Sequence, residues 1–329
     1  MIKLIIKNHE IPINLLSLIG MRMRNDHPRI RQEALNYYSG YKGELSLDYY
    51  LKFINDQSNL ILHDLRLPYI KSYYQIDTLM MIQTFFLILE VKNHANFIRF
   101  DHKNGVMYQG DKKYEDPVGQ AQAQVHQLKS SLHKLGIRDM PVKFLVVFTN
   151  PKAILSEEKD ERVIYSHQLL QKFEELSNEN QTSFIQMPQL NAIANQLITQ
   201  NKPLQSDMFK QLGILPQNLK LGVICPSCQH LHMIRKHGHW FCPKCQIKSH
   251  TAHLRSLFEY QLLFNSQITN RQFRKLCNIE SIKTASRLLM SSGLPHIGEH
   301  RHRIYHLNYN LQQDGRYLLD YFDKLNFRE

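Results

Sequence analysis

Two cysteine pairs are the residues whose types and spacing point most directly to chemistry. They hold four of the chain's five cysteines, Cys225 and Cys228 in one pair and Cys242 and Cys245 in the other. Each CxxC pair can place two thiolates on one tight turn, and two such turns supply the four ligands of a tetrahedral Zn²⁺ site. Four thiolates close the coordination shell, so the spacing predicts a structural zinc ribbon over residues 219–250 rather than a catalytic zinc.

The segment between the cysteine pairs is rich in histidine and contains Trp240 and Phe241. A histidine could replace a cysteine as ligand, but with four cysteines available we expect the imidazoles to lie on the surface or to contact nucleic acid. Trp240 and Phe241 are expected to pack over the small module, with stacking on a base as the alternative.

A second group of residues suited to metal chemistry lies upstream. Glu90 and Lys92 are two apart in an apolar run, so in a strand they face the same side. Asp77 lies in the preceding strand of a predicted hairpin and can approach Glu90. Two carboxylates on one face repel unless a cation lies between them, and carboxylate oxygens suit Mg²⁺ or Mn²⁺. Lys92 could then orient water or stabilise charge on a phosphate. The alternative is a buried Lys–Glu pair or a solvated charged face.

The elements expected to position the acidic group are strands and two helices. A helix containing the amphipathic run Leu45–Ile54 begins near Glu44, and another begins at Pro117 and ends at Gly136. Strand patterns cover residues 59–67, 72–82, 85–92, 95–108 and 142–149. On the second helix, Gln120 and Gln124 share a face and are candidates to hold water, phosphate or the lysine. Gln122 and Gln127 are expected to face solvent.

Charge is concentrated in the C-terminal third. The chain carries a net charge of +12, and residues 219–310 contain thirteen Lys and Arg but three acids. Such a basic segment favours a polyanion, with a merely soluble basic surface as the alternative. Two helices with a short turn between them are predicted from Thr269 or Asn270 to Gly293, followed by a basic hairpin, which is the order of a winged helix-turn-helix. Its candidate DNA contacts are Lys283, Thr284, Ser286, Arg287, Arg301 and Arg303. A helical hairpin for protein contacts is the alternative.

Four segments in order resemble the NERD, or nuclease-related, domain family over about residues 35–150: Gly43-Glu44, Gln75-Ile-Asp77, Leu89-Glu90-Val-Lys92-Asn93 and Pro117-Val-Gly-Gln120. The resemblance implies a restriction-endonuclease-like mixed sheet flanked by helices, with a PD-(D/E)xK type of metal site. It implies that Asp77 and Glu90 bind the metal and that Lys92 is the catalytic lysine. It further implies that Glu44 is an additional acid and that Gln120 is a polar residue on the helix after the sheet.

The sequence therefore predicts an α/β protein with a nuclease-like domain, a zinc ribbon and a winged helix-turn-helix. The expected segments are an N-terminal extension, the nuclease-like domain, a linker, the ribbon, the winged helix and a helical tail, at residues 1–34, 35–180, 181–218, 219–250, 251–310 and 311–329. The predicted function is Mg²⁺-dependent hydrolysis of DNA, recruited by the basic tail. The alternative is a non-catalytic DNA-binding protein whose first domain is a scaffold or a homodimer contact. RNA shares the same electrostatics.

Several classes of protein are not expected. The start of the chain lacks the apolar and small-residue features of a signal peptide, and no run is long and apolar enough for a membrane span. A few cysteines in CxxC pairs indicate a reducing compartment, so we expect a cytoplasmic protein. No Gly-rich phosphate loop followed by Lys-Ser or Lys-Thr is present, so no NTP-driven motor is predicted.

Overall fold

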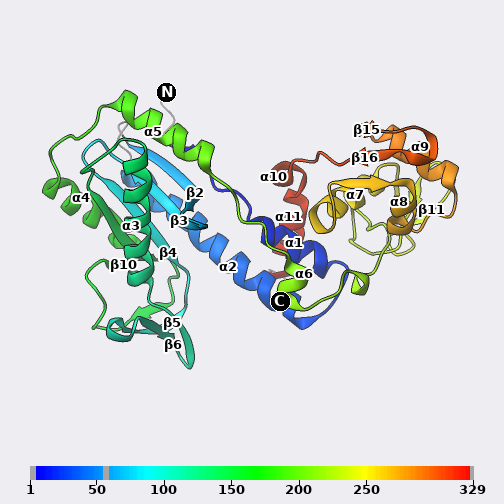
Figure 1. Ribbon diagram of the computed structural model, residues 1–329. Coiled ribbons are helices and arrows are strands. Elements are labelled where there is room, and N and C mark those ends of the chain that lie inside the picture. The colour runs from blue at the N-terminus through cyan, green and yellow to red at the C-terminus, as the bar shows by residue number, and fades with distance from the viewer. Residues whose placement is uncertain (1–4, 55–58, 327–329) are drawn as a thin grey trace. The chain divides into compact units, whose positions relative to one another are not determined.

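The computed structural model describes residues 5–54 and 59–326 (Figure 1). The chain forms two compact units, one comprising residues 1–10 and 38–204 and the other residues 11–37 and 205–329. The outermost residues of the predicted N-terminal extension and C-terminal tail lie outside the described residues.

Unit 1 is built on a mixed six-stranded sheet in the order β1-β2-β3-β4-β8-β10. β2, β3 and β4 form an antiparallel meander, whereas β1 pairs with β2, and β8 with β4 and β10, in parallel. The strands are β1 (Ile5–Lys7), β2 (Leu60–Tyr69), β3 (Ser72–Met81), β4 (Phe86–Lys92), β8 (Val142–Phe148) and β10 (Val163–Tyr165). β4 and β8 are central and covered on both faces, which explains their almost unbroken apolar sequences.

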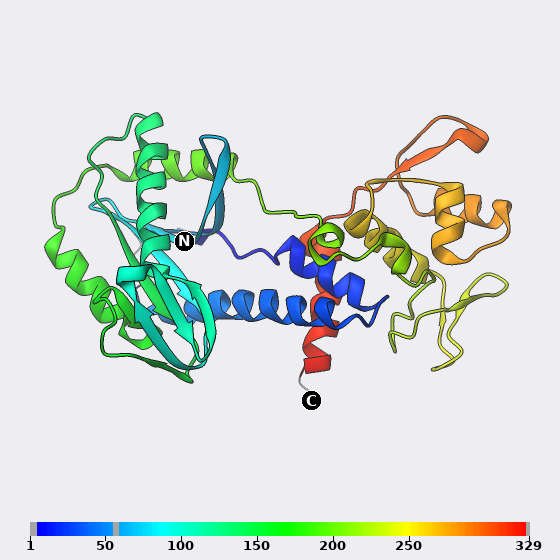
Figure 2. The ribbon, with the colours of Figure 1, turned by 60° about the horizontal axis from the view of Figure 1, so that its bottom comes forward.

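Helices cover both faces of this sheet (Figure 2). One core contains residues of α3 (Pro117–Lys134) and α5 (Met187–Gln200), and the other contains residues of α2 (Pro28–Leu51) and α4 (Leu169–Glu179). The helix predicted near Glu44 is the C-terminal half of α2. Unit 1 is therefore the mixed sheet flanked by helices that the sequence predicted. A second sheet, in the order β7-β6-β5-β9, comprises β5 (Asn96–Asp101), β6 (Val106–Gln109), β7 (Lys112–Glu115) and β9 (Ala153–Leu155).

Unit 2 contains a helical group around the apolar helix α1. α1 packs against α7 and α11, and Arg24 beyond its end donates from Nε to the buried Glu259 at 2.9 Å. Tyr317 donates to the other oxygen of Glu259 at 2.8 Å. The helices of this group are α1 (Ile13–Arg22), α6 (Met208–Leu212), α7 (Ala252–Leu263), α10 (Leu311–Asp314) and α11 (Arg316–Asn326).

Residues 219–250, which hold the four paired cysteines, are termed the cysteine module. This module and the helices after it share one hydrophobic core. Trp240 and Cys242 pack in the same cluster as Phe273, Leu289 and Tyr305. The module carries the sheet of β11 (Ile234–Arg235), β12 (Trp240–Phe241) and β13 (Lys248–Ser249). After it come β14 (Gln267–Thr269), α8 (Asn270–Cys277), α9 (Ile282–Ser291), β15 (His296–Ile297) and β16 (Ile304–His306), with strand order β14-β16-β15. Within the described parts of the chain, no helix combines the length and apolar character needed to cross a membrane.

Candidate functional site

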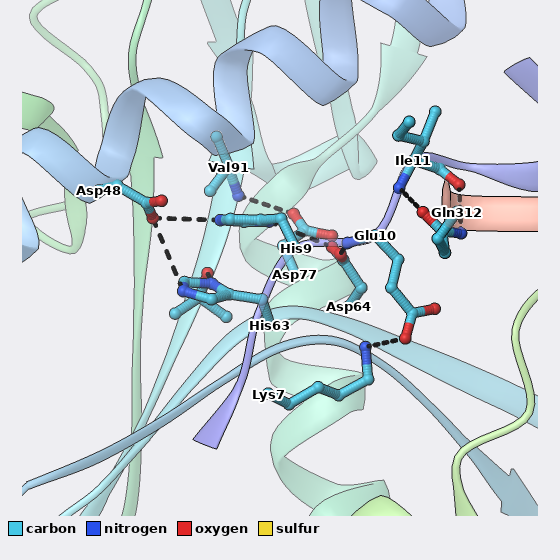
Figure 3. Close-up of polar contacts among 11 residues, drawn as sticks. Lys7, His9, Glu10, Ile11, Asp48, His63, Asp64, Asp77, Val91 and Gln312 are labelled. Carbon is cyan, nitrogen blue, oxygen red and sulfur yellow. Dashed lines mark hydrogen bonds and ion pairs between the residues drawn. The ribbon is translucent and has the colours of Figure 1, made fainter. Parts of the chain in front are cut away.

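The predicted acidic group lies where two neighbouring strands separate. The β3–β4 ladder ends at Thr78 opposite Leu89, and one step further in the same register Asp77 lies opposite Glu90. Beyond that point β3 continues beside β2, and β4 beside β8. The backbone N–H of Val91 donates to the Asp77 carboxylate at 2.9 Å (Figure 3). At the end of the β3–β4 ladder, the Asp77 side chain thus takes the place of a backbone acceptor. Residues opposite each other in a strand pair project to the same face. The two predicted metal ligands, Asp77 and Glu90, therefore lie together where β3 and β4 separate.

Side chains of α3 hold Glu90 and Lys92 in position. Lys92 Nζ donates to Glu90 Oε1 at 2.6 Å and to Gln120 Oε1 at 2.9 Å. Gln124 Nε2 donates to the other oxygen of Glu90 at 2.6 Å. Burial alone would lower the pKa of Lys92, but the negative charges of Glu90 and Asp77 raise it. The structure therefore brings Gln120 and Gln124 to the acidic group, and the lysine beside it is held in the charged form.

A further carboxylate lies on the neighbouring strand. Because His63 pairs with Thr78 and Leu65 with Ile76, Asp64 lies opposite Asp77. The regular pairing is interrupted at Asp64, whose φ is +53°. Three consecutive strands thus carry an acid at one level, namely Asp64, Asp77 and Glu90.

Burial and mutual repulsion raise the pKa values of two acids in this group. Burial, followed by the charges of Asp77 and Asp64, raises the pKa of Glu44 on α2 to about 10. Burial and the charge of Glu90 raise the pKa of Asp77 to about 8. Both shifts have the sign expected when carboxylates gather with too few positive charges between them.

Close packing of α2 on the sheet brings Glu44 to this group. A Cβ atom added at Gly43 would lie 2.6 Å from the Cβ of Asn93, just after β4, and 3.1 Å from Thr149 Oγ1. Asn93 in turn donates from Nδ2 to the carbonyl of Ser39 at 2.7 Å. A residue larger than glycine would hold α2 away from the sheet, so Gly43 permits the approach that places its neighbour Glu44 among the carboxylates.

The donor set fits a hard divalent cation. Lys92 places one positive charge beside Glu90, and the pKa values of Asp77 and Glu44 are nevertheless raised, first by burial and then by the neighbouring carboxylates. Carboxylate oxygens are the ligands that Mg²⁺ and Mn²⁺ prefer. Asp77 and Glu90 would hold the ion, with Glu44 and Asp64 beside them.

Sequence reasoning missed Asp64 and its neighbours. Asp64, Asp77 and Glu90 are spaced thirteen residues apart, and with two short turns this spacing is the cross-strand register. That spacing was the available signal. His9 also lies here, with its Nδ1 3.6 Å from Asp64 Oδ1. Its position depends on the pairing of β1 with β2, for which the local sequence holds no signal.

The four cysteines of the predicted zinc site lie together. Cys225 Sγ is 3.6 Å from Cys245 Sγ, and Cys228 Sγ is 3.6 Å from Cys242 Sγ. All four ligand atoms lie within 4.8 Å of one another. A Zn–S distance of 2.3 Å gives tetrahedral S–S edges of about 3.8 Å, close to the observed separations. The cysteines are free thiols and are compatible with a zinc ribbon.

The two halves of the cysteine module have the same local conformation. The N–H of Gln229 donates to the carbonyl of Cys225 at 3.0 Å, and the N–H of Gln246 to that of Cys242 at 2.9 Å. These two glutamines, each directly after a CxxC pair, have φ values of +59° and +61°. A left-handed residue in this position turns the chain directly after each cysteine pair.

The predicted DNA contacts lie on two elements of unit 2. On α9, Lys283 and Arg287 are exposed, Thr284 is half-buried, and Ser286 accepts a hydrogen bond from Asn270 at 2.9 Å. Ser281 caps the helix by accepting from the N–H of Thr284 at 3.2 Å. Beyond β15, Arg301 is exposed and donates to His302, whereas Arg303 is half-buried. α9 and the hairpin therefore present cations, but the hydroxyl of Ser286 already has a protein partner.

One comparison with known proteins matches the segment of the chain that contains the first of these sites. A search of curated proteins and a search of solved structures each found no match. A family model described as the nuclease-related domain, NERD, matches residues 39–149. The matched segment contains Glu44, Asp77, Glu90, Lys92 and Gln120. This chain therefore carries a nuclease-related domain over residues 39–149, and the strand opening described above lies within it.

Proposed function

We propose that unit 1 hydrolyses phosphodiester bonds of DNA with Mg²⁺ as its metal. The observation that carries the proposal is the position of Lys92, within hydrogen-bond distance of both Glu90 and Gln120 at the point where β3 and β4 separate. An ion pair that served stability alone would need no further carboxylates at the same level of the sheet. The additional acids Asp64 and Asp77 are better explained by a divalent cation bound there, which could in turn bind a phosphate.

Each side chain has a role that follows from its contacts. Asp77 and Glu90 would hold the metal, and Glu44 would support it from α2. A bound divalent cation would neutralise phosphate charge and acidify a water molecule. Lys92, kept charged by its carboxylate neighbours, would orient the attacking water or stabilise the charge that develops on the phosphate. Gln120 fixes the lysine by its hydrogen bond.

We also propose that unit 2 brings DNA to the protein. The order α8, turn, α9 and β15–β16 hairpin supports a winged helix-turn-helix, with α9 as the helix that enters a groove. Lys283 and Arg287 lie one turn apart on it. Arg235 of β11 is close enough to Arg287 that burial and this like charge together lower its pKa. Neighbouring cations on the ribbon and the helix suit a line of phosphates.

The test of the nuclease proposal uses several nucleic acids and metals. The full-length protein is incubated with supercoiled, linear and single-stranded DNA and with RNA, each with Mg²⁺, with Mn²⁺ and without either. Cleavage of DNA with Mg²⁺ is expected. Glu90→Ala is expected to abolish cleavage while DNA binding in gel shifts stays largely intact. Lys92→Ala is expected to lower the rate about 10²–10³-fold, because a charge that acts in the transition state is lost.

Matched controls come from the same helix. Gln120→Ala is expected to lower the cleavage rate about tenfold or more through loss of Lys92 positioning, whereas Gln122→Ala, at an exposed position of α3, should leave it unchanged. Lys129→Ala removes an exposed lysine from α3 and controls for charge. Equal residual cleavage by Glu90→Ala in clean preparations would refute the proposal. Strong sequence-preferring DNA binding without metal-dependent nicking would instead assign a non-catalytic DNA-binding role, and cleavage of RNA alone would change the substrate.

A further inference from the structure

A second cluster of metal-binding side chains lies beside the carboxylates, at the end of β1. His9 follows β1, and its ring stacks on that of His63 from β2 with ring centroids 3.7 Å apart. Asp48 of α2 faces both rings, with its Oδ1 3.1 Å from His9 Nε2 and 3.6 Å from His63 Nε2 (Figure 3). Elements distant in the sequence thus bring two imidazole nitrogens to one carboxylate oxygen. These three residues are termed the histidine site.

Both rings are buried, and each has one ring nitrogen without a hydrogen-bond partner among the described residues. The side chains of His9 and His63 are 5% and 0% exposed. His63 Nδ1 lies 2.9 Å from Thr78 Oγ1, which leaves Nε2 to face Asp48. Among the residues that the structure describes, neither His63 Nε2 nor His9 Nδ1 has a hydrogen-bond partner. A buried polar atom without a partner costs about 1–3 kcal/mol, and an ion bound at His63 Nε2 would remove this cost there.

The spacing of the donor atoms matches a coordination shell. In a tetrahedral zinc site with Zn–N and Zn–O distances of about 2.0–2.2 Å, ligand atoms are roughly 3.4 Å apart. The two nitrogen–oxygen separations of 3.1 and 3.6 Å lie on either side of this value. All three donor atoms lie within 4.8 Å of one another. Binding would open the stacked rings so that both nitrogens point at a common ion.

We infer that His9, Asp48 and His63 bind a divalent transition-metal ion, with Zn²⁺ as the ion that these ligands suit best. Two imidazoles and one carboxylate favour zinc and its neighbours, whereas Mg²⁺ favours an all-oxygen shell. Three protein ligands leave a fourth position for water. The site differs in ligand chemistry from both the cysteine module and the proposed Mg²⁺ site, and it does not depend on the nuclease reaction.

A simpler explanation of these contacts is a protonated His9 without a metal ion. Its Nε2–H would donate to Asp48, and its charge would lie beside Asp64. That arrangement satisfies Asp48, but it leaves His63 Nε2 facing the same oxygen at 3.6 Å in a dry environment. One ion shared by both rings would be bound by Nε2 of His9, Nε2 of His63 and the Asp48 carboxylate, while His9 Nδ1 would still face Asp64.

The histidine site would fix the helix that carries Glu44. Asp48 follows Glu44 by one turn on α2, so both project toward the same side of the helix. His9 lies outside the matched segment 39–149, in a part of the chain that no comparison assigns. A bound ion would therefore join β1, β2 and α2 and hold Glu44 close to the row of acids.

The test measures tightly bound zinc in the full-length protein. The protein is loaded with Zn²⁺, freed of weakly bound metal by gel filtration, and analysed for zinc per chain. About two ions are expected, one in the histidine site and one in the cysteine module. Asp48→Asn, a same-sized change of a side chain that is 31% exposed, should lose one ion. Cys242→Ser with Cys245→Ser should lose the other. With Co²⁺ in place of zinc, Asp48→Asn should keep the thiolate charge-transfer band and lose absorption from the nitrogen–oxygen site.

Two further variants make the outcome unambiguous. His133→Ala removes an exposed imidazole from α3 and should keep both ions. Asp77→Asn should also keep both, because that residue belongs to the carboxylate group. Zinc content that is unchanged in Asp48→Asn would overturn the inference and assign protonated His9 to the contact. Loss of zinc in Asp77→Asn but not in Asp48→Asn would place the ion among the carboxylates and overturn it equally.

Discussion

At the scale of single residues, the buried carboxylates of unit 1 link the stability of the protein to pH. The folded protein raises the pKa of Asp77 to about 8, so it holds this proton more tightly than the unfolded chain does. The resulting stabilisation is complete below the unfolded pKa of about 4 and is lost as the pH rises through about 8. Glu44 acts in the same direction up to about pH 10.

The melting temperature of the Mg²⁺-free protein is therefore expected to fall from about pH 5 to about pH 9. Saturating Mg²⁺ or Mn²⁺ should oppose the fall, and more strongly at high pH, because the ion replaces the missing positive charge. Calorimetry in metal-depleted buffers without chelator measures this while the thiolate zinc stays bound. Asp77→Asn should flatten the decline, whereas Asp111→Asn, at an exposed turn, should not. A melting temperature that rises over this range would contradict the electrostatic account.

A second residue-scale prediction concerns the glutamine after each CxxC pair. Gln246 is exposed and has a φ of +61°, a conformation that costs a residue with a Cβ atom about 1–2 kcal/mol. Gln246→Gly relieves this strain but adds freedom to the unfolded chain, so we expect a net stabilisation of about 0.5–1 kcal/mol. Gln246→Ala keeps the Cβ atom and should show no gain. Denaturant unfolding of unit 2 measures both variants.

Residue types in the sequence predicted many of the residues that the structure brings together, but not all of them. Asp77, Glu90, Lys92 and the cysteines were identifiable because short-range spacing determines their neighbours. His9 was not, because its contacts with residues far along the chain exist only after β1 and α2 have docked on β2.

At the scale of elements, the contact between α2 and the sheet determines where Glu44 lies. Gly43→Ala is expected to destabilise unit 1 by about 1–3 kcal/mol, because the new methyl group would overlap Asn93. It should also weaken metal binding by moving Glu44 outward. Gly40→Ala on the same helix meets nothing within 4 Å and should stabilise by about 0.5–1 kcal/mol through helix propensity. Thermal melts of both variants test the contact, and equal effects would show that α2 does not pack closely at residue 43.

The strands around the acidic group were predictable because they are apolar runs bounded by turns. α5 was not predicted, since its segment is rich in Gln and Asn and resembles a linker by composition. Its four buried residues nevertheless follow helical spacing, namely Leu190, Ile193, Ala194 and Leu197. The helical spacing of these apolar residues predicts the helix, although the overall composition of the segment does not.

At the scale of the whole molecule, the shared core of unit 2 predicts that zinc bound by the four cysteines would stabilise the helices after them as well. Trp240 is the single tryptophan of the chain, is 1% exposed, and donates from its indole N–H to His253 at 3.2 Å. Removal of zinc by a strong chelator is expected to red-shift its fluorescence and to speed amide exchange in α8 and α9, because Phe273 and Leu289 pack in the same cluster. Exchange in β3 and β4 serves as the comparison. Unchanged protection of α8 would show that the helices fold without the ribbon.

The bounds of the family match have a practical consequence for anyone who isolates that segment. Residues 39–149 contain β2, β3, β4 and β8, but β1 and β10, which form the two edges of the sheet, lie outside them. A fragment cut at these bounds would expose the backbone hydrogen-bonding groups of β2 near Ile61 and of β8 from Val146 to Phe148, and unpaired strand edges can pair with further copies. We expect the excised fragment to aggregate in light-scattering measurements, whereas the full-length protein, which keeps β1 and β10, should stay dispersed.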